Sequence, residues 1–204
     1  MNFTEIKRRI EDRGITYNDY IGNTIKELAG IRIFNLTSEE VKRYNYKTLN
    51  LQRSNRISRT YNPNKDLRGL LKEISEPQLW MVITESWCGD SAQSLPYIAA
   101  MALQNQLIDL KILLRDANPD IMDKFLTNGT RSIPIIVAFN ADGEELFRWG
   151  PRPQTAVKLI EQWKAEGLQK TEWIEKLHLW YAKDKGTEIE KEFVGLLNKV
   201  ELAH

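Results

Sequence analysis

The pattern of hydrophobic and polar residues changes character near residue 77. Before this point, apolar residues recur every three or four positions among polar ones, which predicts amphipathic helices. The last of these helices is predicted from four apolar residues at positions i, i+3, i+4 and i+7, namely Leu67, Leu70, Leu71 and Ile74. From Trp80 onward, short apolar runs alternate with helical stretches, which indicates a mixed α/β domain.

Three more helices are expected ahead of Leu67. The first ends near Gly14 and the second before Gly30. Thr37-Ser38-Glu39-Glu40 is a capping signal that opens a long third helix, which ends at Asn62-Pro63-Asn64. Its inner face is expected to consist of Val41, Tyr44, Thr48 and Leu51.

The central part of the chain predicts a sheet with parallel and antiparallel strands. "LWMVIT" (79–84) and "LKILLRD" (110–116) read as strands, and a helix from Cys88 to about Leu103 joins them. "IPIIVAF" (133–139) and "EELFRW" (144–149) flank Asn140-Ala141-Asp142-Gly143, a hairpin turn. We therefore expect a parallel strand pair followed by an antiparallel one.

Helices are expected again after Gly150-Pro151. Val157, Ile160 and Trp163 define one helix, and two more follow Gly167. The first of these two carries Trp173 and Trp180 and the second carries Phe193, and we expect these aromatic residues to pack against a face of the sheet. The second is expected to open with a capping box at Thr187-Glu188-Ile189-Glu190.

Length and composition favour one domain with added helices. The chain has 204 residues, 42% of them hydrophobic, which is enough for a single good core. We divide it into an N-terminal helical extension packed on the core (1–76), an α/β core (77–168) and C-terminal helices (169–204).

The charge is nearly balanced overall but unevenly distributed. The net charge is +1, so global electrostatics does not draw the protein to nucleic acid. The segment 41–65 has no acidic residue and carries Lys42, Arg43, Lys47, Arg53, Arg56, Arg59 and Lys65. It could contact nucleic acid or another anionic partner, but we favour a solvated helix packed on the fold, and expect no nucleic-acid partner.

Cysteine usage and hydropathy indicate a cytoplasmic protein. One cysteine excludes an internal disulfide, the N-terminal segment has no apolar targeting region, and no apolar run approaches the roughly 20 residues of a membrane span. His178 is the one histidine besides the C-terminal His204, and it has no acidic or cysteine partner at the spacing of metal ligands. We expect no membrane partner, no metal and no cofactor.

The single cysteine lies in "WCGDS", Trp87 to Ser91, where a predicted strand runs directly into a helix. A helix N-terminus favours an anion, so the thiol pKa is expected to fall from its ordinary value of about 8.5. Asp90 opposes this fall because a nearby carboxylate disfavours a second negative charge. We predict a modestly lowered pKa.

Four spaced features resemble the thioredoxin-like superfamily over about residues 78–166. They are the strand ending in Trp87-Cys88-Gly89-Asp90, then Pro96 in the following helix, then Ile133-Pro134 at a strand start, and finally Gly150 after the hairpin. The resemblance implies a thioredoxin-like fold, a mixed central sheet flanked by helices. It also implies a cis peptide bond at Ile133-Pro134, close to Cys88, in a substrate groove shaped by Trp87, Gly89, Asp90, Ile133 and Pro134.

Two departures from this family pattern restrict the chemistry. Ser91 stands where a dithiol protein has its second, resolving cysteine, and Val82 stands where the family has a buried acid. The resemblance therefore implies a thiol–disulfide oxidoreductase without a resolving cysteine. Cys88 would form a mixed disulfide with a protein or low-molecular-weight substrate, Ser91 would donate a hydrogen bond to its sulfur, and an external thiol would release it.

Two alternatives stay open. Cys88 could be a relic in a redox-inactive thioredoxin-fold binding module. The C-G-x-S motif also resembles monothiol glutaredoxins that carry an iron–sulfur cluster, although "AFNADGEELFRWGPRP" (138–153) lacks the paired glycines and acid with which glutaredoxins bind glutathione. The sequence predicts neither the client nor the oligomeric state.

Overall fold

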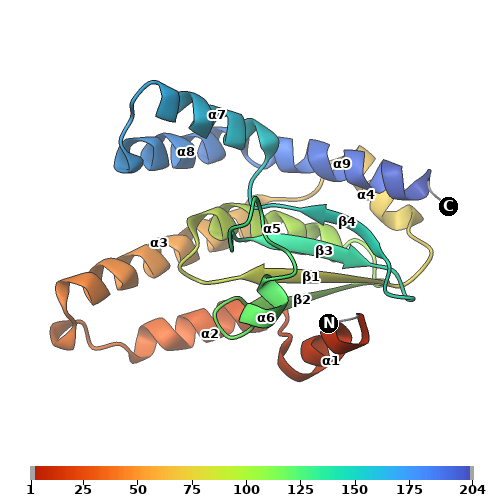
Figure 1. Ribbon diagram of the computed structural model, residues 1–204, viewed down its shortest axis with the longest axis horizontal. Helices are drawn as coiled ribbons and strands as arrows, with labels where there is room; N and C mark the ends of the chain where they lie inside the picture. The colour runs from red at the N-terminus through yellow and green to blue at the C-terminus, as the bar shows by residue number, and fades with distance from the viewer. Residues whose placement is uncertain (1–2, 203–204) are drawn as a thin grey trace.

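A four-stranded sheet with helices on both faces forms the centre of the protein (Figure 1). The computed structural model describes residues 3–202. The strands are β1 (Gln78–Thr84), β2 (Ile108–Leu114), β3 (Ile135–Phe139) and β4 (Glu145–Trp149). The helices are α1 (Phe3–Arg13), α2 (Tyr17–Gly30), α3 (Ser38–Thr60), α4 (Lys65–Glu73), α5 (Gly89–Ala102), α6 (Pro119–Met122), α7 (Gln154–Ala165), α8 (Lys170–Asp184) and α9 (Thr187–Glu201), with a 3-10 turn at Ile33–Asn35.

The strand order β2-β1-β3-β4 confirms the predicted mixture of pairings. β1 runs parallel to β2, as a strand-helix-strand unit requires, and antiparallel to β3, which pairs with β4 in the predicted hairpin. The mixed α/β class with additional helices is therefore confirmed. Among residues 3–202, no helix is long and apolar enough to cross a membrane.

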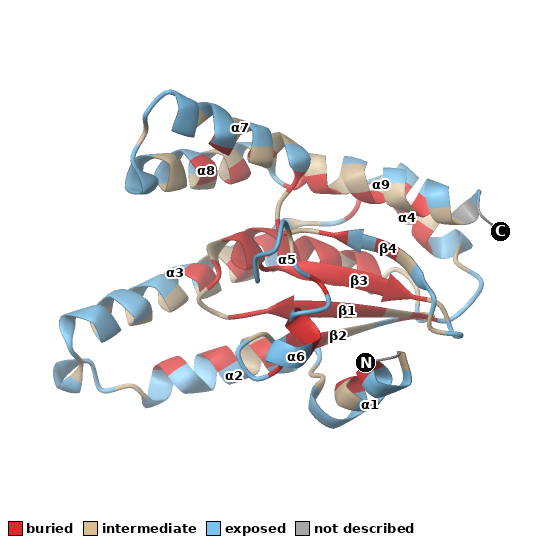
Figure 2. Ribbon diagram, viewed as in Figure 1, coloured by how far each residue is buried: buried red, intermediate tan, exposed pale blue. Residues whose placement is uncertain are grey.

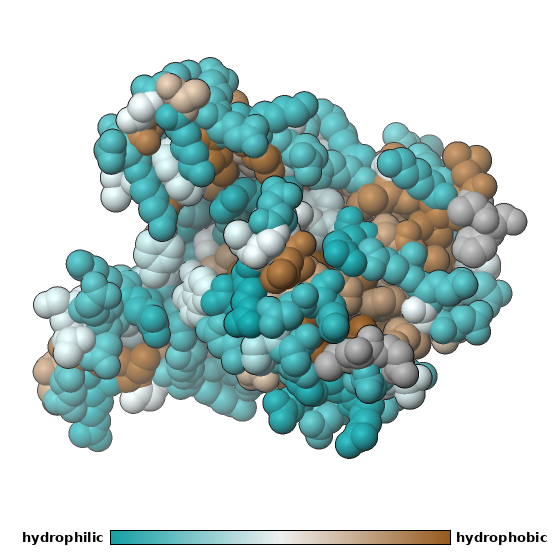
Figure 3. Space-filling model, in the orientation of Figure 1, coloured by the Kyte–Doolittle hydropathy of each residue, from teal (hydrophilic) through white to brown (hydrophobic). Residues whose placement is uncertain are grey.

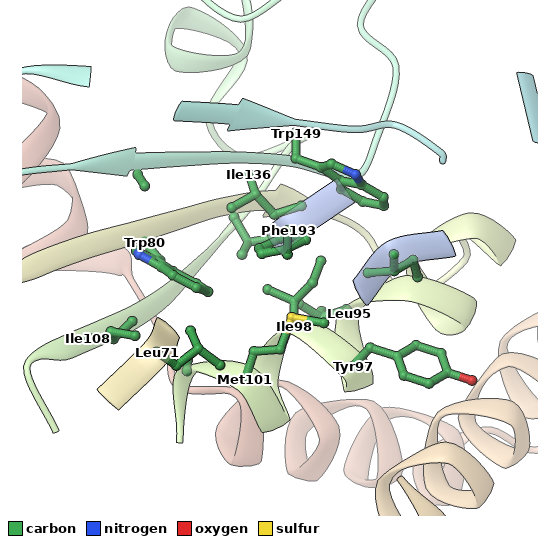
Figure 4. Close-up of a cluster of buried hydrophobic side chains, with 14 of the residues drawn as sticks. Leu71, Trp80, Leu95, Tyr97, Ile98, Met101, Ile108, Ile136, Trp149 and Phe193 are labelled. Atoms are coloured by element: carbon green, nitrogen blue, oxygen red, sulfur yellow. The ribbon is translucent and has the colours of Figure 1, made fainter. Parts of the chain in front are cut away.

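Both faces of the sheet are covered, which explains why the strands are almost continuously apolar (Figure 2). Trp80 and Val82 point to the face covered by α5, α4 and α9, whereas Met81 and Ile83 point to the face covered by α1 and α6. On the face covered by α5, α4 and α9, Trp80 and Phe193 lie between the sheet and Leu95 of α5 (Figure 4).

Helix α9 anchors the C-terminal region on the sheet through Phe193. Its ring centroid lies 5.8 Å from that of Trp80 and 5.9 Å from those of Phe147 and Trp149. The predicted capping box at its start is wrong, because Gly186 is the N-cap and the Asp184 carboxylate accepts the Glu188 N–H at 3.2 Å.

The aromatic residues of α8 do not pack against the sheet, contrary to the prediction. Trp173 and Trp180 lie in a separate cluster with α7, whose buried members are Ala156, Ile160, Leu177 and Tyr181. α7 and α8 form a helical hairpin beside the sheet (Figure 1), whereas α9 packs on the sheet face through Phe193, as predicted. The periodicity identified the apolar side of α8 correctly but not the partner of that side.

The N-terminal helices pack on the core from several directions. The predicted capping box of α3 is confirmed, since Glu40 Oε2 accepts the Thr37 N–H at 2.8 Å. The predicted inner face is not the buried one, because the first half of α3 extends beyond the core beside α2 (Figure 1). The buried residues of α3 lie in its second half and are Asn50, Ser54 and Ile57.

The segment between α1 and α2 protects the edge of the sheet. Ile15 exchanges two backbone hydrogen bonds with Ile112 of β2, at 3.0 and 2.8 Å. α1 to α4 fall within residues 1–76, and α8 and α9 fall within 169–204. The three-part division at these boundaries stays a prediction.

Candidate functional site

Cys88 lies where β1 turns into α5, as the sequence predicts. β1 ends at Thr84, and Cys88 is the N-cap residue of α5, with φ −78° and ψ 116°. The Cys88 N–H donates to the Glu85 carbonyl at 3.0 Å, which closes the short turn between them. The sulfur is thereby held next to the first backbone N–H groups of α5.

The loop before β3 passes directly beside this sulfur. The Ile133–Pro134 peptide bond is cis, and the Cys88 thiol donates to the Ile133 carbonyl across 3.3 Å. Ile133 and Cys88 also belong to the same buried cluster. The structure thus brings together two predicted site residues that are 45 positions apart.

Cys88 is more deeply buried than its position at a helix start suggested. Only 8% of the residue is exposed. Burial raises the pKa of its thiol, the Asp90 charge raises it further, and hydrogen bonds from Ser91 and the backbone N–H groups of Asp90 and Ser91 lower it by less. The prediction of a lowered pKa is therefore wrong, because desolvation outweighs the helix N-terminus.

Ser91 is held beneath the sulfur by another buried hydroxyl. Ser91 is 1% exposed, and its Oγ accepts a hydrogen bond from Thr84 Oγ1. A hydroxyl that accepts one hydrogen bond still has its own proton to donate. The Ser91 hydroxyl is among the hydrogen-bonding groups that lower the pKa of Cys88.

The Asp90 carboxylate is directed into the protein and is fully engaged there. Its Oδ2 pairs with Arg152 Nη2 at 2.7 Å, and its Oδ1 accepts the Tyr181 hydroxyl at 2.9 Å. Arg152 follows the β4 hairpin strand and Tyr181 lies on α8, so the site motif is joined to both C-terminal segments. Arg152 and Tyr181 were missed by the sequence reasoning, since neither lies in a recognisable motif.

Gly89 faces His178, a residue that the sequence reasoning did not place in the site. A Cβ added at Gly89 would lie 3.0 Å from His178 Cε1, so a larger residue here would require the imidazole ring to shift. Arg53 Nη1 lies 3.3 Å from His178 Nε2, and Gln93 Nε2 lies 3.5 Å from Nδ1. Burial, and then the Arg53 charge, lower the pKa of His178 to about 4, so the ring is neutral at pH 7.

A second link ties the turn before Cys88 to α3. The buried Asn50 donates through Nδ2 to the Ser86 carbonyl at 3.2 Å and accepts from Arg53 Nη1 at 3.2 Å. Because Arg53 also contacts His178, one hydrogen-bonded chain runs from the site turn through α3 to α8.

Among the described residues, no cluster of His, Cys, Asp or Glu is arranged to hold a metal.

Glu85 is the acid nearest to Cys88 in the preceding turn. Its Oε1 accepts the backbone N–H of Asp116 at 2.8 Å, and its burial raises the pKa of its carboxyl group. Val82 is fully buried in the layer beneath α5, so the family's buried acid has no counterpart at that position.

An open pocket of about 510 Å³ lies over Cys88. Trp87, Ile133 and Pro151 contribute apolar walls, and the charged residues Asp90, Arg115, Arg131 and Arg152 complete much of the rim. The Arg115 guanidinium lies 4.7 Å above the Trp87 ring. The space-filling view shows a hollow between the lobe of α7 and α8 and the far ends of α2 and α3 (Figure 3).

Comparisons with known proteins agree with this architecture. The sequence profile of a family described as thioredoxin matches residues 37–164, more than half of the chain. No curated protein matches the chain in sequence. A crystal structure of a protein of unknown function from Pseudomonas aeruginosa superposes with a TM-score of 0.59, at 18% identity over 95% of both chains. A crystal structure of an HIV epitope-scaffold gives a TM-score of 0.58, at 16% identity over 100% of both chains.

Proposed function

This chain belongs to the thioredoxin family, and we propose that it exchanges thiols and disulfides through a mixed disulfide on Cys88. The observation that carries the proposal is the position of the sulfur. It lies at the start of α5, 3.3 Å from the Ile133 carbonyl, and Cys88 lines an open pocket. Trp87 and Ile133 also line this pocket, and we expect the second sulfur to approach Cys88 there.

The first step of the exchange needs no added reductant, because the Cys88 thiolate supplies the electron pair of the new S–S bond. Loss of the thiol proton to solvent gives the Cys88 thiolate, which attacks one sulfur of a disulfide R–S–S–R. The new Cys88–S–S–R bond forms as the old S–S bond breaks, and R–S⁻ leaves and takes up a proton. Ser91 has no sulfur with which to attack this adduct, so an external thiol must release it and restore the Cys88 thiol.

The pKa of Cys88 shapes the expected rate. A raised pKa leaves less thiolate at pH 7, but the thiolate that does form is a stronger nucleophile. The Asp90 charge disfavours the Cys88 thiolate, and its ion pair with Arg152 offsets part of that effect. We therefore propose a slow, pH-dependent monothiol reaction rather than rapid dithiol turnover.

The direct test is adduct formation with a small disulfide such as bis(2-hydroxyethyl) disulfide. Intact mass spectrometry should detect one adduct per chain, absent from Cys88→Ser. Because the pKa of Cys88 is raised, the rate should continue to increase above pH 8.5, where an ordinary thiol begins to level off. Absence of an adduct at every pH between 7 and 10 would refute the proposed function.

A redox-inactive binding module is the second candidate, and the burial of Cys88 favours it. The thiol of a residue that is only 8% exposed, with a raised pKa, is a poor nucleophile at neutral pH. In that case the folded protein would fail to form the adduct, whereas the same protein unfolded in urea would form it readily. The comparison of folded and unfolded protein thus separates the two candidates.

A further inference from the structure

The pocket over Cys88 carries an excess of positive charge. Arg115, Arg131 and Arg152 line it, together with one carboxylate, that of Asp90. Each of the three guanidinium groups is paired with a carboxylate, Arg152 with Asp90 inside the pocket and Arg115 and Arg131 with Asp116 and Asp123 outside its lining. Arg115 and Arg131 therefore offer a ligand their remaining N–H donors.

These two arginines are fixed by carboxylates that lie outside the lining of the pocket. Arg131 donates through Nε and Nη2 to Asp123 at 2.6 and 2.7 Å, which uses two of the five N–H donors of its guanidinium. Arg115 pairs with Asp116 at 2.8 Å and donates to the Arg131 carbonyl at 3.2 Å. Both groups are therefore held in place before any ligand arrives, which reduces the entropy that binding must cost.

The positive surface continues on the far side of Trp87. A neighbouring hollow shares Trp87 and Arg115 with the pocket over Cys88 and adds Lys42 and Arg43 of α3, against Glu39 and Asp116. An elongated anion could thus extend from Cys88 past the Trp87 ring toward α3. The basic residues at the start of the segment 41–65 acquire a place in the site in this way.

We propose that this pocket selects small disulfides and thiols that carry carboxylate groups. The inference rests on the proposed function, and it deepens it by naming the substrate class. A guanidinium fork matches a carboxylate, so Arg115 and Arg131 would bind the carboxylates while the disulfide sulfur meets Cys88. Only 8% of the Cys88 residue is exposed, which favours a low-molecular-weight substrate over a folded protein.

The reaction follows the steps given above. The Cys88 thiolate attacks one sulfur of a carboxylated disulfide, the Cys88–S–S–R bond forms, and the carboxylated thiolate R–S⁻ leaves. A second, different carboxylated thiol R′–SH then attacks the adduct, which returns Cys88 to the thiol and releases the mixed disulfide R–S–S–R′. The net reaction is R–S–S–R + R′–SH → R–S–S–R′ + R–SH, in which R–S–S–R is the oxidant, R′–SH is the reductant, and atoms and electrons balance.

The test uses three small disulfides that differ mainly in charge. They are 3,3′-dithiodipropionate (dianion), bis(2-hydroxyethyl) disulfide (neutral) and cystamine (dication). Each rate of adduct formation is divided by the rate for the same protein unfolded in urea, which removes differences in intrinsic reactivity. One unit charge about 7 Å from another in water changes a rate by about threefold. Because Asp116 and Asp123 offset part of the charge of Arg115 and Arg131, the dianion should be favoured over the neutral probe by about threefold.

Variants locate the preference. Arg131→Gln should reduce the ratio of the dianion rate to the neutral rate by about threefold. The double variant Lys42→Gln/Arg43→Gln should also reduce this ratio, although it leaves Arg131 in place. Arg8→Gln, an exposed arginine on α1, is the matched control and should keep the full ratio. Salt at about 0.5 M should weaken the preference, because it shortens the screening length.

The outcomes are distinguishable. Equal normalised rates for the three probes, or an unchanged ratio in both pocket variants, would overturn the inference and leave the proposed function intact. Failure of all three probes to form an adduct with the folded protein would overturn both.

Discussion

Cys88 and Ser91 define the chemistry at the scale of single residues, because one can start a thiol exchange and the other cannot finish it. The two residues are separated by one helical turn, and the Ser91 hydroxyl is a hydrogen-bond partner of the Cys88 sulfur. A sulfur at position 91 would therefore lie within reach of a mixed disulfide on Cys88.

Ser91→Cys should gain this internal route. An adduct on Cys88 would be attacked intramolecularly, so its lifetime should fall by at least about tenfold relative to wild type. Ser94→Cys is the matched control, since Ser94 is equally buried in α5 but lies almost two turns from Cys88. Adduct lifetimes followed by intact mass spectrometry would contradict this geometry if the two variants behaved alike.

Single residues also show which features of the site could be predicted from the sequence and which could not. The position of Cys88 between strand and helix followed from the local sequence pattern, and its proximity to Ile133 followed from the resemblance to the thioredoxin-like superfamily. The direction of its pKa did not, because burial depth depends on the whole fold. His178 and Tyr181 reach the site across 85 and 91 positions, through contacts with Gln93 and Asp90, and no sequence spacing signals such contacts.

At the scale of helices and strands, the apolar pattern predicted which elements exist, and of which type, better than it predicted which elements pack together. β1 and β3 were recognisable because both of their faces are buried. α8 shows the limit of the method. Its apolar side was evident, but a helix can bury that side on a sheet or on another helix, and periodicity does not distinguish the two.

The docking of α9 on the sheet can be tested by one substitution. Phe193 is fully buried among Trp80, Phe147 and Trp149, so Phe193→Ala should lower the free energy of unfolding by about 3–5 kcal/mol. Phe34→Ala is the matched control, because Phe34 is 82% exposed, and it should change stability by less than about 0.5 kcal/mol. Urea denaturation measures both, and a loss below about 1 kcal/mol for Phe193→Ala would contradict the packing.

At the scale of the whole molecule, His178 connects two regions that are far apart in the chain. It lies on α8, contacts Arg53 of α3 and Gln93 of α5, and faces Gly89 of the site motif. The ring fits this place only when it is neutral, because it has a cationic neighbour and little solvent.

The pH dependence of stability should reveal this constraint. The pKa of His178 is lowered to about 4 in the folded protein and is near 6.5 when unfolded, so its contribution is complete above pH 6.5 and is lost as the pH falls toward 4. Between pH 7 and pH 5 the wild type should lose about 1 kcal/mol more than His178→Gln, after allowance for the partial exposure of the ring.

Urea denaturation at the two pH values provides the measurement. The other titrating groups, including Glu85, are common to both proteins and cancel in the comparison. The same loss of stability in both proteins would show that His178 is not held neutral by its surroundings.

The contacts from α8 also bear on the protein during its synthesis. Chains emerge from the ribosome N-terminus first, so β1, Cys88 and the Ile133 loop are made well before His178 and Tyr181. A nascent chain that has reached only α7 holds the thiol turn without its α8 contacts, and Asp90 then lacks the Tyr181 hydroxyl. The residues that flank Cys88 in the site motif therefore receive their contacts from α8 only in the last stage of synthesis, when His178 reaches Gly89 and Tyr181 reaches Asp90.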